Sequence, residues 1–466
     1  MRRERDSMGE LQVPADALYG ANTQRARLNF PISELRFNRS FIRAIAQIKQ
    51  AAAVVNRELG ELDPKIADSI IAAAGRVAEG QHDDAFVVDI FQTGSGTSTN
   101  MNVNEVISNL AIQALGGELG SRKPVHPNDH VNKGQSSNDV IPSAIHLAAA
   151  TAIAERLLPA MQELEQALLA KSKEFWSIVK TGRTHLQDAT PIRLGQEFLG
   201  YAGQIELGRR RIEHALAELR VLALGGTAVG TGVGMHPEFA RRVIARLSET
   251  TGLKLSETSN HFQAQSTIDA VVEASGSLKT VATSLMKIAN DFRWLGSGPR
   301  AGLGELALPE VQPGSSIMPG KVNPVIAESL TMACAQVIGN DVTVTIAGQS
   351  GNFELNVMMP VAAYNLLQSI DLLATSCTNF SAQCVAGVKA TGHGPAMVEK
   401  GLAICTALAP IIGYDAAAAI AKKASQTGET IKEVALRETK LSASELDKVL
   451  DPAKMTEPGA RIQAGG

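Results

Sequence analysis

Apolar residues recur at alternating spacings of three and four through long stretches of the chain between about residues 140 and 390. The clearest stripe consists of Leu278, Val281, Leu285, Ile288, Phe292 and Leu295. Similar stripes run through 157–168 and 198–219. This spacing puts the apolar side chains on one face of a helix, and its heptad-like repeat predicts long helices packed side by side in a bundle. Long helices need packing partners on several sides, so we expect the chain to self-associate.

The rest of the chain is arranged around this bundle, and we expect a mainly α fold with three domains. Residues 1–138 predict a mostly helical N-terminal domain, 139–392 the central long-helix domain, and 393–466 a small helical C-terminal domain. Sequence rich in Ala, Ile and Val from about 41 to 80 favours helices, and a further helix is expected at 416–425. Alternating Val and Thr at 342–346 favours a strand by propensity alone, so this stretch stays ambiguous.

The composition is that of an ordinary globular protein, and it excludes two classes of partner. Of 466 residues, 44% are hydrophobic and 20% charged; the formal net charge is −3, and no polybasic run favours nucleic acid or a membrane surface. We find no apolar run near twenty residues and no signal peptide, so we expect a cytoplasmic protein. Four widely spaced cysteines are expected to be reduced and buried: Cys334, Cys377, Cys384 and Cys405.

Polar islands rich in hydroxyls, amides and glycines interrupt the apolar sequence. They cover residues 93–105, 126–139, 180–191, 225–234 and 314–324. Donor-rich loops at helix ends are typical of sites that bind oxygen-rich anions. The positive charges within them are Lys321, Arg183, Lys133 and histidines, an inventory that suits a small dicarboxylate. The islands must converge through folding or through neighbouring subunits.

The island at 314–324 is the most unusual of these. Pro319 and Pro324 fix the backbone, and Gly320 tolerates crowded conformations, so we expect a shaped loop. Asn323 and Pro324 are expected to be the N-cap and first residue of a helix that places Glu328 in its first turn. The spacing does not fit a nucleotide-binding P-loop or a serine-hydrolase elbow. A Gly/Pro-rich surface connection is the plain alternative, but it leaves the lysine and paired serines unexplained.

The residues available for chemistry are hydroxyls, histidines, acids and one loop lysine. No metal-binding motif is present; His126 and His130 are four residues apart, but Pro127 weakens helical geometry there. Proton abstraction beside a carboxylate followed by β-elimination suits a donor-rich sequence with few titrating groups. His185 can be a structural loop residue or a catalyst. Glu328 can be a plain first-turn acid, or it can orient His185 if the two are adjacent.

The loop Gly314–Pro324 resembles the signature of the fumarase/aspartase superfamily, and the other islands resemble the family's remaining conserved regions in the same order. The resemblance runs from about Gly9 to Pro458. Within the superfamily, Gly182–Pro191 and Pro319–Pro324 are similar to class II fumarases. Aspartases tend to carry Gln where His185 stands and Ala where Gly320 stands.

This resemblance implies a homotetramer with a twenty-helix core, in which three subunits contribute to each active site. It implies reversible hydration of fumarate to L-malate, a reaction of the tricarboxylic acid cycle, through a carbanion (aci-carboxylate) intermediate and without a metal or organic cofactor. Ser315 would be the base, with Lys321 stabilising its alkoxide. His185, paired with Glu328, would activate water or protonate the leaving hydroxyl.

The resemblance also implies the residues that bind the substrate carboxylates. These are Ser95, Thr97, Asn100, Ser136, Ser137, Asn138, Thr184, Ser316, Lys321 and Asn323. A second dicarboxylate site near the entrance is implied at His126, Pro127, Asn128 and Asp129. His130 stands where the family usually has Asp, and Gly134 where it commonly has Ser or Met, which puts the affinity and pH response of the second site in question.

Two other functions remain open at this point. An aspartate ammonia-lyase on the same fold would use the same base, since both reactions are β-eliminations from a dicarboxylate, although His185 favours hydroxide as the leaving group. A non-catalytic helical scaffold is the second alternative. The presence of Ser315, Lys321, His185 and Glu328 argues against it, because a silent relative would be free to lose them.

Overall fold

The computed structural model describes residues 1–458 and confirms a mainly α fold. The chain divides into two compact units. Unit 1 comprises 1–159, 208–283 and 333–375, and unit 2 comprises 160–207, 284–332 and the chain from 376 onward. The divisions fall within the long helices, α6 (Leu158–Glu174), α7 (Leu194–Leu219), α10 (Asp269–Leu295), α11 (Val325–Gly348) and α12 (Met359–Phe380). The boundaries expected after residues 138 and 392 stay a prediction, and 459–466 lie outside the described residues.

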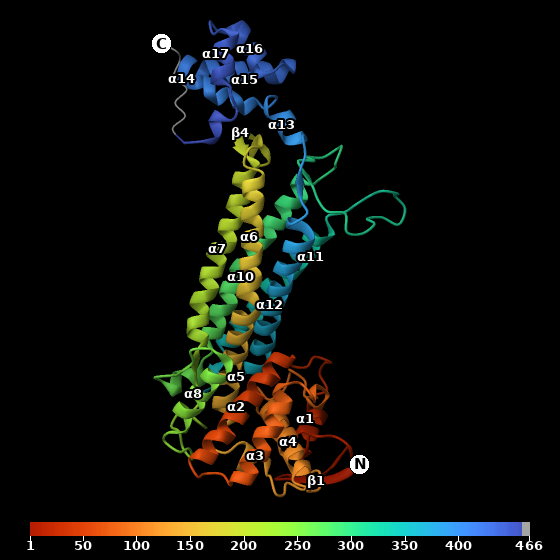
Figure 1. Cartoon of the computed structure of the whole chain (residues 1–466), viewed down its shortest axis with the longest axis vertical. Coiled ribbons are helices and arrows are strands. Elements are labelled where there is room, and N and C mark those ends of the chain that lie inside the picture. The colour runs from red at the N-terminus through yellow and green to blue at the C-terminus, as the bar shows by residue number, and fades with distance from the viewer. Residues whose placement is uncertain (459–466) are drawn as a thin grey trace. The chain divides into compact units, whose positions relative to one another are not determined.

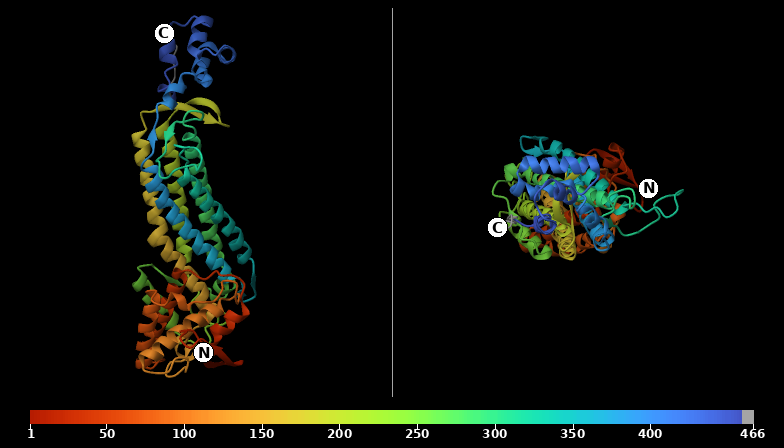
Figure 2. Two further views of the ribbon diagram at one scale, coloured as in Figure 1. Left: turned by 90° about the vertical axis from the view of Figure 1, so that its right-hand side faces the viewer. Right: turned by 90° about the horizontal axis from the view of Figure 1, so that it is seen from above.

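The predicted apolar stripes form the buried faces of these long helices. Leu278, Val281, Leu285, Ile288 and Phe292 of α10 are all buried. Within unit 2, α6, α7 and α10 lie alongside one another in both ribbon views (Figures 1 and 2). Ring contacts join them: Phe292 lies 5.4 Å from Phe198 of α7 and 5.1 Å from Phe380 of α12, measured between ring centroids. The long helices predicted from the spacing are therefore confirmed.

Unit 1 begins with a hairpin and a group of helices. Its elements are β1 (Arg2–Asp6), β2 (Gly9–Val13), α1 (Ala21–Asn29), α2 (Arg39–Glu58), α3 (Pro64–Ala78), η1 (Asp83–Ala85), α4 (Thr97–Ala114), η2 (Pro127–Val131), α5 (Ser137–Ala152), η3 (Ile153–Leu157), β5 (Val221–Leu222), α8 (Phe239–Thr251), β6 (Ser256–Glu257), α9 (His261–Ser266), β8 (Gly351–Asn352) and β9 (Leu355–Asn356). The helices expected between 41 and 80 are α2 and α3. Asn38 caps α2, and Asp63 followed by Pro64 starts α3.

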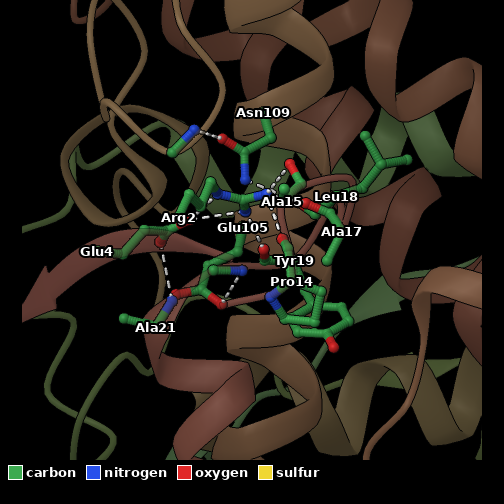
Figure 3. A network of polar contacts seen from close by, with 12 residues as sticks. Arg2, Glu4, Pro14, Ala15, Ala17, Leu18, Tyr19, Ala21, Glu105 and Asn109 are labelled. Carbon is green, nitrogen blue, oxygen red and sulfur yellow. Dashed lines mark hydrogen bonds and ion pairs between the residues drawn. The ribbon is translucent and has the colours of Figure 1, made fainter. Parts of the chain in front are cut away.

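Two charged side chains hold the segment between the N-terminal hairpin and α1 in place (Figure 3). The Arg2 guanidinium donates to the backbone oxygens of Pro14, Ala17 and Tyr19 at 2.7–2.9 Å. The buried Glu105 carboxylate of α4 accepts the backbone N–H groups of Gly20, Asn22 and Thr23, which open α1. An anion at the N-terminus of a helix is favourable because unpaired N–H groups gather there. These contacts hold α1 against α4.

Unit 2 carries a hairpin and the C-terminal helices. Its elements are β3 (Val179–Thr184), β4 (Gln187–Arg193), β7 (Leu306–Ala307), η4 (Ser381–Val385), β10 (Lys389–Ala390), α13 (His393–Val398), η5 (Leu402–Leu408), α14 (Ala409–Ile412), α15 (Tyr414–Thr427), α16 (Ile431–Glu438), α17 (Ala443–Val449) and η6 (Lys454–Thr456). The helix expected at 416–425 lies within α15. Buried Ile404, Leu408, Ile420, Val434 and Leu446 form a separate apolar cluster among the C-terminal helices.

Helix α11 settles the ambiguous stretch, because Val342–Ile346 is helical and not a strand. This helix and the continuous segment Ser137–Glu174 are long and apolar enough to cross a membrane by length and composition, so the expectation of no such run was wrong. The most apolar part of Ser137–Glu174 is 72% buried, as in the core helix of a globular protein, whereas that of α11 is 39% buried. None of the four cysteines forms a disulfide bond within residues 1–458; three are buried and Cys405 is half-buried.

Candidate active site

The five polar islands fall into two groups. Those at 93–105, 126–139 and 225–234 belong to unit 1, and those at 180–191 and 314–324 belong to unit 2. Hydrogen bonds join the three islands of unit 1 directly, as described next. The sequence-predicted residues are thus gathered into two sets.

Two glycines shape the first island where it enters α4. A Cβ on Gly94 would lie 1.8 Å from the carbonyl oxygen of Val357, so only glycine fits there. Gly96, at φ 74°, is the left-handed residue directly before the helix. The turn between them presents Ser95 and Thr97 at the N-terminus of α4, where backbone N–H groups are unpaired.

A chain of hydroxyls connects the first and second islands. The Ser95 Oγ and Thr97 Oγ1 atoms share a hydrogen bond of 2.8 Å, and Thr97 Oγ1 shares another of 2.7 Å with Ser137 Oγ. Ser137 donates weakly to the Oδ1 of Asn138 at 3.4 Å, and the Asn138 amide donates to the carbonyl oxygen of Ala228 in the glycine-rich island. Four predicted carboxylate-binding residues therefore form one connected set at the N-termini of α4 and α5.

Asp139 fixes the backbone beneath this set. One of its oxygens accepts the Ser136 N–H at 2.9 Å, completing a capping box at the start of α5. The other accepts the N–H groups of Gly225 and Thr227 at 3.1 and 3.0 Å. Burial raises the pKa of Asp139, and the three backbone donors oppose that rise. Sequence analysis did not single out Asp139, although its spacing from Ser136 is that of a capping box.

Asn100 lies one turn inside α4 and is buried. Its amide donates to the Oδ1 of Asn132 at 3.2 Å. Within residues 1–458, the Oδ1 of Asn100 has no hydrogen-bond partner. A buried amide acceptor without a partner is uncommon in folded proteins.

The proposed second dicarboxylate site forms a single π-helical turn, η2, after His126. The Nδ1 of His126 accepts the N–H groups of Asn128 and Asp129 at 3.2 Å, and its own backbone N–H donates to the Nδ1 of His130 at 2.9 Å. Both imidazoles are thus oriented by backbone donors. Burial lowers the pKa of His130. In the described part of the chain, no three His, Cys, Asp or Glu side chains are grouped in a way that could hold a metal ion.

In unit 2, the loop Gly314–Pro324 closes on itself. The Gly314 N–H donates to the Lys321 carbonyl oxygen at 2.8 Å, and the Asn323 amide donates to the Gly314 carbonyl oxygen at 2.7 Å. The Lys321 Nζ donates to the Oδ1 of Asn323 at 2.8 Å. Ser315 Oγ accepts the N–H groups of Ile317 and Met318. The loop is shaped as predicted, and it presents Ser315, Ser316 and Lys321 at the surface.

The predicted helix start near this loop needs a correction. Helix α11 begins at Val325, one residue later than expected, and Glu328 lies in its first turn. Asn323 does not cap the helix, because its side chain binds Gly314 and Lys321 within the loop. The loop thus uses the asparagine to position the lysine.

His185 and Leu186 form the tip of the β3–β4 hairpin. Both have positive φ, 56° and 58°, and Thr184 pairs with Gln187 directly below them. Two such residues are typical of a type I′ turn, a conformation that histidine and leucine rarely adopt. Thr184 and His185 are exposed. Backbone strain at an exposed histidine is the kind of outlier that marks functional positions.

Buried charges below hold this hairpin in place. The Lys180 ammonium lies 2.7 Å from Glu197 and 2.8 Å from Glu305, and Arg183 lies 2.6 Å from Glu305. Burial raises the pKa of Glu197, and Lys180 opposes that rise. Arg183 is therefore engaged by Glu305, and Lys133 similarly lies 3.4 Å from Glu61. Of the three expected cations, Lys321 is the one that in the described residues bonds only to an uncharged side chain.

No hydrogen bond or ion pair joins His185 to Glu328 within residues 1–458, so their pairing stays a prediction. The loop does line a cleft of about 560 Å³ with the end of α10. Asn290, Arg293 and Trp294 face this cleft with Lys321 and Asn323. Sequence analysis missed the first three; the only signal was their place at the end of the longest apolar stripe.

Two known protein families match the chain. Residues 9–339 match the family described as "Lyase", and residues 404–457 match the family described as "Fumarase C C-terminus". The first covers more than half of the sequence, so the chain belongs to this lyase family.

The branch within that family is the class II fumarases. The chain is 54% identical to a protein of Methylorubrum extorquens described as fumarate hydratase class II, over 98% of each chain. It is 53% identical to the mitochondrial fumarate hydratase of Rattus norvegicus, over 98% of this chain and 90% of the rat protein. The crystal structure of the class II fumarase of Schistosoma mansoni superimposes with a TM-score of 0.95 at 40% identity, covering 98% and 99% of the two chains.

Proposed function

We propose that this chain catalyses the reversible hydration of fumarate to L-malate. The observation that carries the proposal is the Gly314–Pro324 loop, a hydrogen-bonded loop that carries both Ser315 and Lys321. The relatives that share the whole length of the chain are described as fumarate hydratases. The hydroxyl set around Thr97 supplies neutral donors that suit a carboxylate.

In the dehydration of L-malate to fumarate, the alkoxide of Ser315, stabilised by Lys321, takes a proton from C3 and becomes a hydroxyl. The electron pair left on C3 moves into the adjacent carboxylate, giving an aci-carboxylate that the positive charge of Lys321 and the neutral donors stabilise. The C2–oxygen bond then breaks, and a proton from His185 converts the leaving hydroxide to water. Ser95, Thr97, Asn100, Ser136, Ser137, Asn138, Thr184, Ser316 and Asn323 hold the two carboxylates.

Self-association is part of this proposal. The base and the lysine belong to unit 2, whereas the connected hydroxyl set belongs to unit 1. Helix α11 exposes an apolar row in the single chain, with Met332 68%, Val342 56% and Ile346 49% exposed. Contiguous exposed apolar surface on a long helix marks an interface. We therefore infer a homotetramer in which α11 is covered by partner subunits and the active sites are shared.

The test is the change in absorbance of the fumarate double bond, with L-malate and L-aspartate supplied in parallel. Signal from malate that Ser315→Ala abolishes while the protein stays folded supports hydration with Ser315 as base. Signal from aspartate alone would instead establish an ammonia-lyase, and silence with both substrates would favour a non-catalytic scaffold. His185 favours release of hydroxide over release of ammonia, and the description of the Methylorubrum extorquens relative as a fumarate hydratase also favours hydration.

A further inference from the structure

Lys49 is a lysine in the core of unit 1. It lies on the buried face of α2, is 0% exposed, and has Ile45, Ile48 and Ala52 as buried neighbours on the same helix. A buried ammonium is costly unless it is paired or hydrogen-bonded, so such a residue calls for an explanation. The hydration mechanism above makes no use of it.

The Lys49 ammonium has one hydrogen-bond acceptor in the described residues, the Oδ1 of Asn132 at 2.8 Å. That same oxygen also accepts the amide Nδ2 groups of Asn100 at 3.2 Å and Asn104 at 3.1 Å. The Nδ2 of Asn132 donates to the carbonyl oxygen of Gln135. One donor from α2 and two from α4 therefore converge on the side-chain oxygen of Asn132, the residue directly after η2.

The hydrogen bond from Lys49 decides how these amides are oriented. The Lys49 nitrogen donates to Asn132, and both its ammonium and its neutral amine form have N–H groups for this bond, so Asn132 faces it with oxygen and not with its NH₂ group. Once that oxygen is in place, Asn100 and Asn104 must present their NH₂ groups to it. The Oδ1 of Asn100 is then directed away from Asn132, and it has no hydrogen-bond partner among residues 1–458.

We propose that Lys49 is a positioning residue of the active site, which fixes the amide orientation of the substrate-binding residue Asn100 through Asn132. The inference rests on the proposed function, in which Asn100 contacts a substrate carboxylate or the hydroxyl group that is removed. Lys49 itself touches no substrate. It determines that the oxygen of the Asn100 amide, and not its NH₂ group, is left for the substrate.

Charge near Lys49 is consistent with this role. Asp139 of α5 is the charged group that acts on Lys49 within the described residues, whereas the hydrogen-bond acceptor of Lys49 is the neutral amide of Asn132. Asp139 also fixes the backbone of Ser136, Gly225 and Thr227. Lys49 therefore orients the buried amides of unit 1, and Asp139 positions the backbone beside its connected hydroxyls.

The test uses Lys49→Met, which keeps the length of the side chain and removes the ammonium. The substitution removes the desolvation cost of the lysine, but it also removes an opposite charge near buried Asp139, so thermal unfolding is measured to establish that the variant is folded. We expect KM for fumarate to rise about tenfold and kcat to change less than threefold in the folded variant. Ile45→Ala on the same buried face is the control: it should lower the midpoint and leave KM within twofold of the wild-type value.

A double-mutant cycle with Asn100→Ala then separates positioning from general packing. If Lys49 acts through Asn100, the KM of the double variant equals that of Asn100→Ala within about twofold. Independent effects that multiply, or an unchanged KM in an active Lys49→Met protein, would overturn this inference alone. A wild-type protein inactive with fumarate and malate would overturn the proposed function and this inference with it.

Discussion

Thr97 Oγ1 and Ser137 Oγ lie 2.7 Å apart although forty residues separate them in the chain. Each stands at the beginning of a helix, α4 and α5 respectively, and Ser95 extends the hydrogen-bonded chain from the other side. Hydroxyls that hydrogen-bond one another can exchange donor and acceptor roles by rotating their O–H groups. They can therefore turn these O–H groups toward a bound carboxylate while the backbone stays where it is.

This relationship predicts coupled effects on substrate binding. Thr97→Val and Ser137→Ala should each raise KM by about ten- to a hundredfold, since a lost hydrogen bond to a charged group costs roughly 1.5–3 kcal/mol. The double variant should show less than the product of the two effects, because each hydroxyl orients the other. Initial rates over a range of fumarate concentrations measure this. Effects that multiply fully would show that the two hydroxyls act independently.

The paired serines of the Gly314–Pro324 loop should behave differently from each other. We expect Ser315→Ala to lower kcat by roughly 10²–10⁴-fold, the usual contribution of a positioned base. Ser316→Ala is the matched control, and it should mainly raise KM because Ser316 is assigned to carboxylate binding. Circular dichroism confirms that both variants are folded. A larger loss of kcat in Ser316→Ala would transfer the role of base to Ser316.

His130 gives a prediction that concerns the proposed second site. Its Nδ1 accepts the His126 N–H, and burial lowers its pKa. His130→Asp keeps an acceptor there and adds a negative charge beside Asp129. It should therefore change apparent KM or the pH profile more than kcat, which rate measurements between pH 6 and 8.5 would show. A tenfold loss of kcat with KM unchanged would count against a separate second site.

The long helices could be predicted from sequence because their apolar spacing depends only on which face is buried. The Val342–Ile346 stretch could not, since β-branched residues favour strands locally while the surrounding α11 holds them in a helix. The islands were found from composition, but the Thr97–Ser137 contact depends on tertiary folding. Lys49 was missed because a single lysine within an apolar helix resembles a surface residue; its four-residue spacing from Ile45 was the available signal.

The stability of the protein should depend on pH through Lys49. Burial lowers its pKa to about 7, with Asp139 opposing, whereas the unfolded value is about 10.4. Between these pH values the unfolded chain binds more protons than the folded one, so the free energy of unfolding rises with pH. Below about pH 7 the lysine is charged in both states, and its contribution is constant.

This effect is measured by comparing urea unfolding of the wild type and Lys49→Met at pH 7, 8 and 9. The difference between the two free energies should change in favour of the wild type by up to about 1.4 kcal/mol per pH unit. Titrating groups that do not interact with Lys49 cancel in the comparison, whereas Asp139 does interact with it. A difference that is constant across this range would show that Lys49 stays protonated in the folded protein.

The exposed row on α11 gives the test of self-association. Gly339 lies between Met332 and Val342 on this face, and a Cβ placed there would meet no atom of the same chain within 4 Å. Gly339→Leu therefore fits the single chain but prevents the close approach of a partner helix. Val342→Glu is also tolerated in the single chain, where Val342 is exposed, but it would bury a charge in the interface and so oppose association.

We expect both variants to keep their helical content and to elute as smaller species in size-exclusion chromatography with light scattering. Their kcat should fall at least a hundredfold, because the proposal places active-site residues on different subunits. Gly339→Ala and Val342→Thr are the matched controls and should associate like the wild type. A Gly339→Leu protein that dissociates to monomers yet retains full activity would show that one chain holds a complete active site. That result would contradict shared active sites, but it would still place the interface on α11.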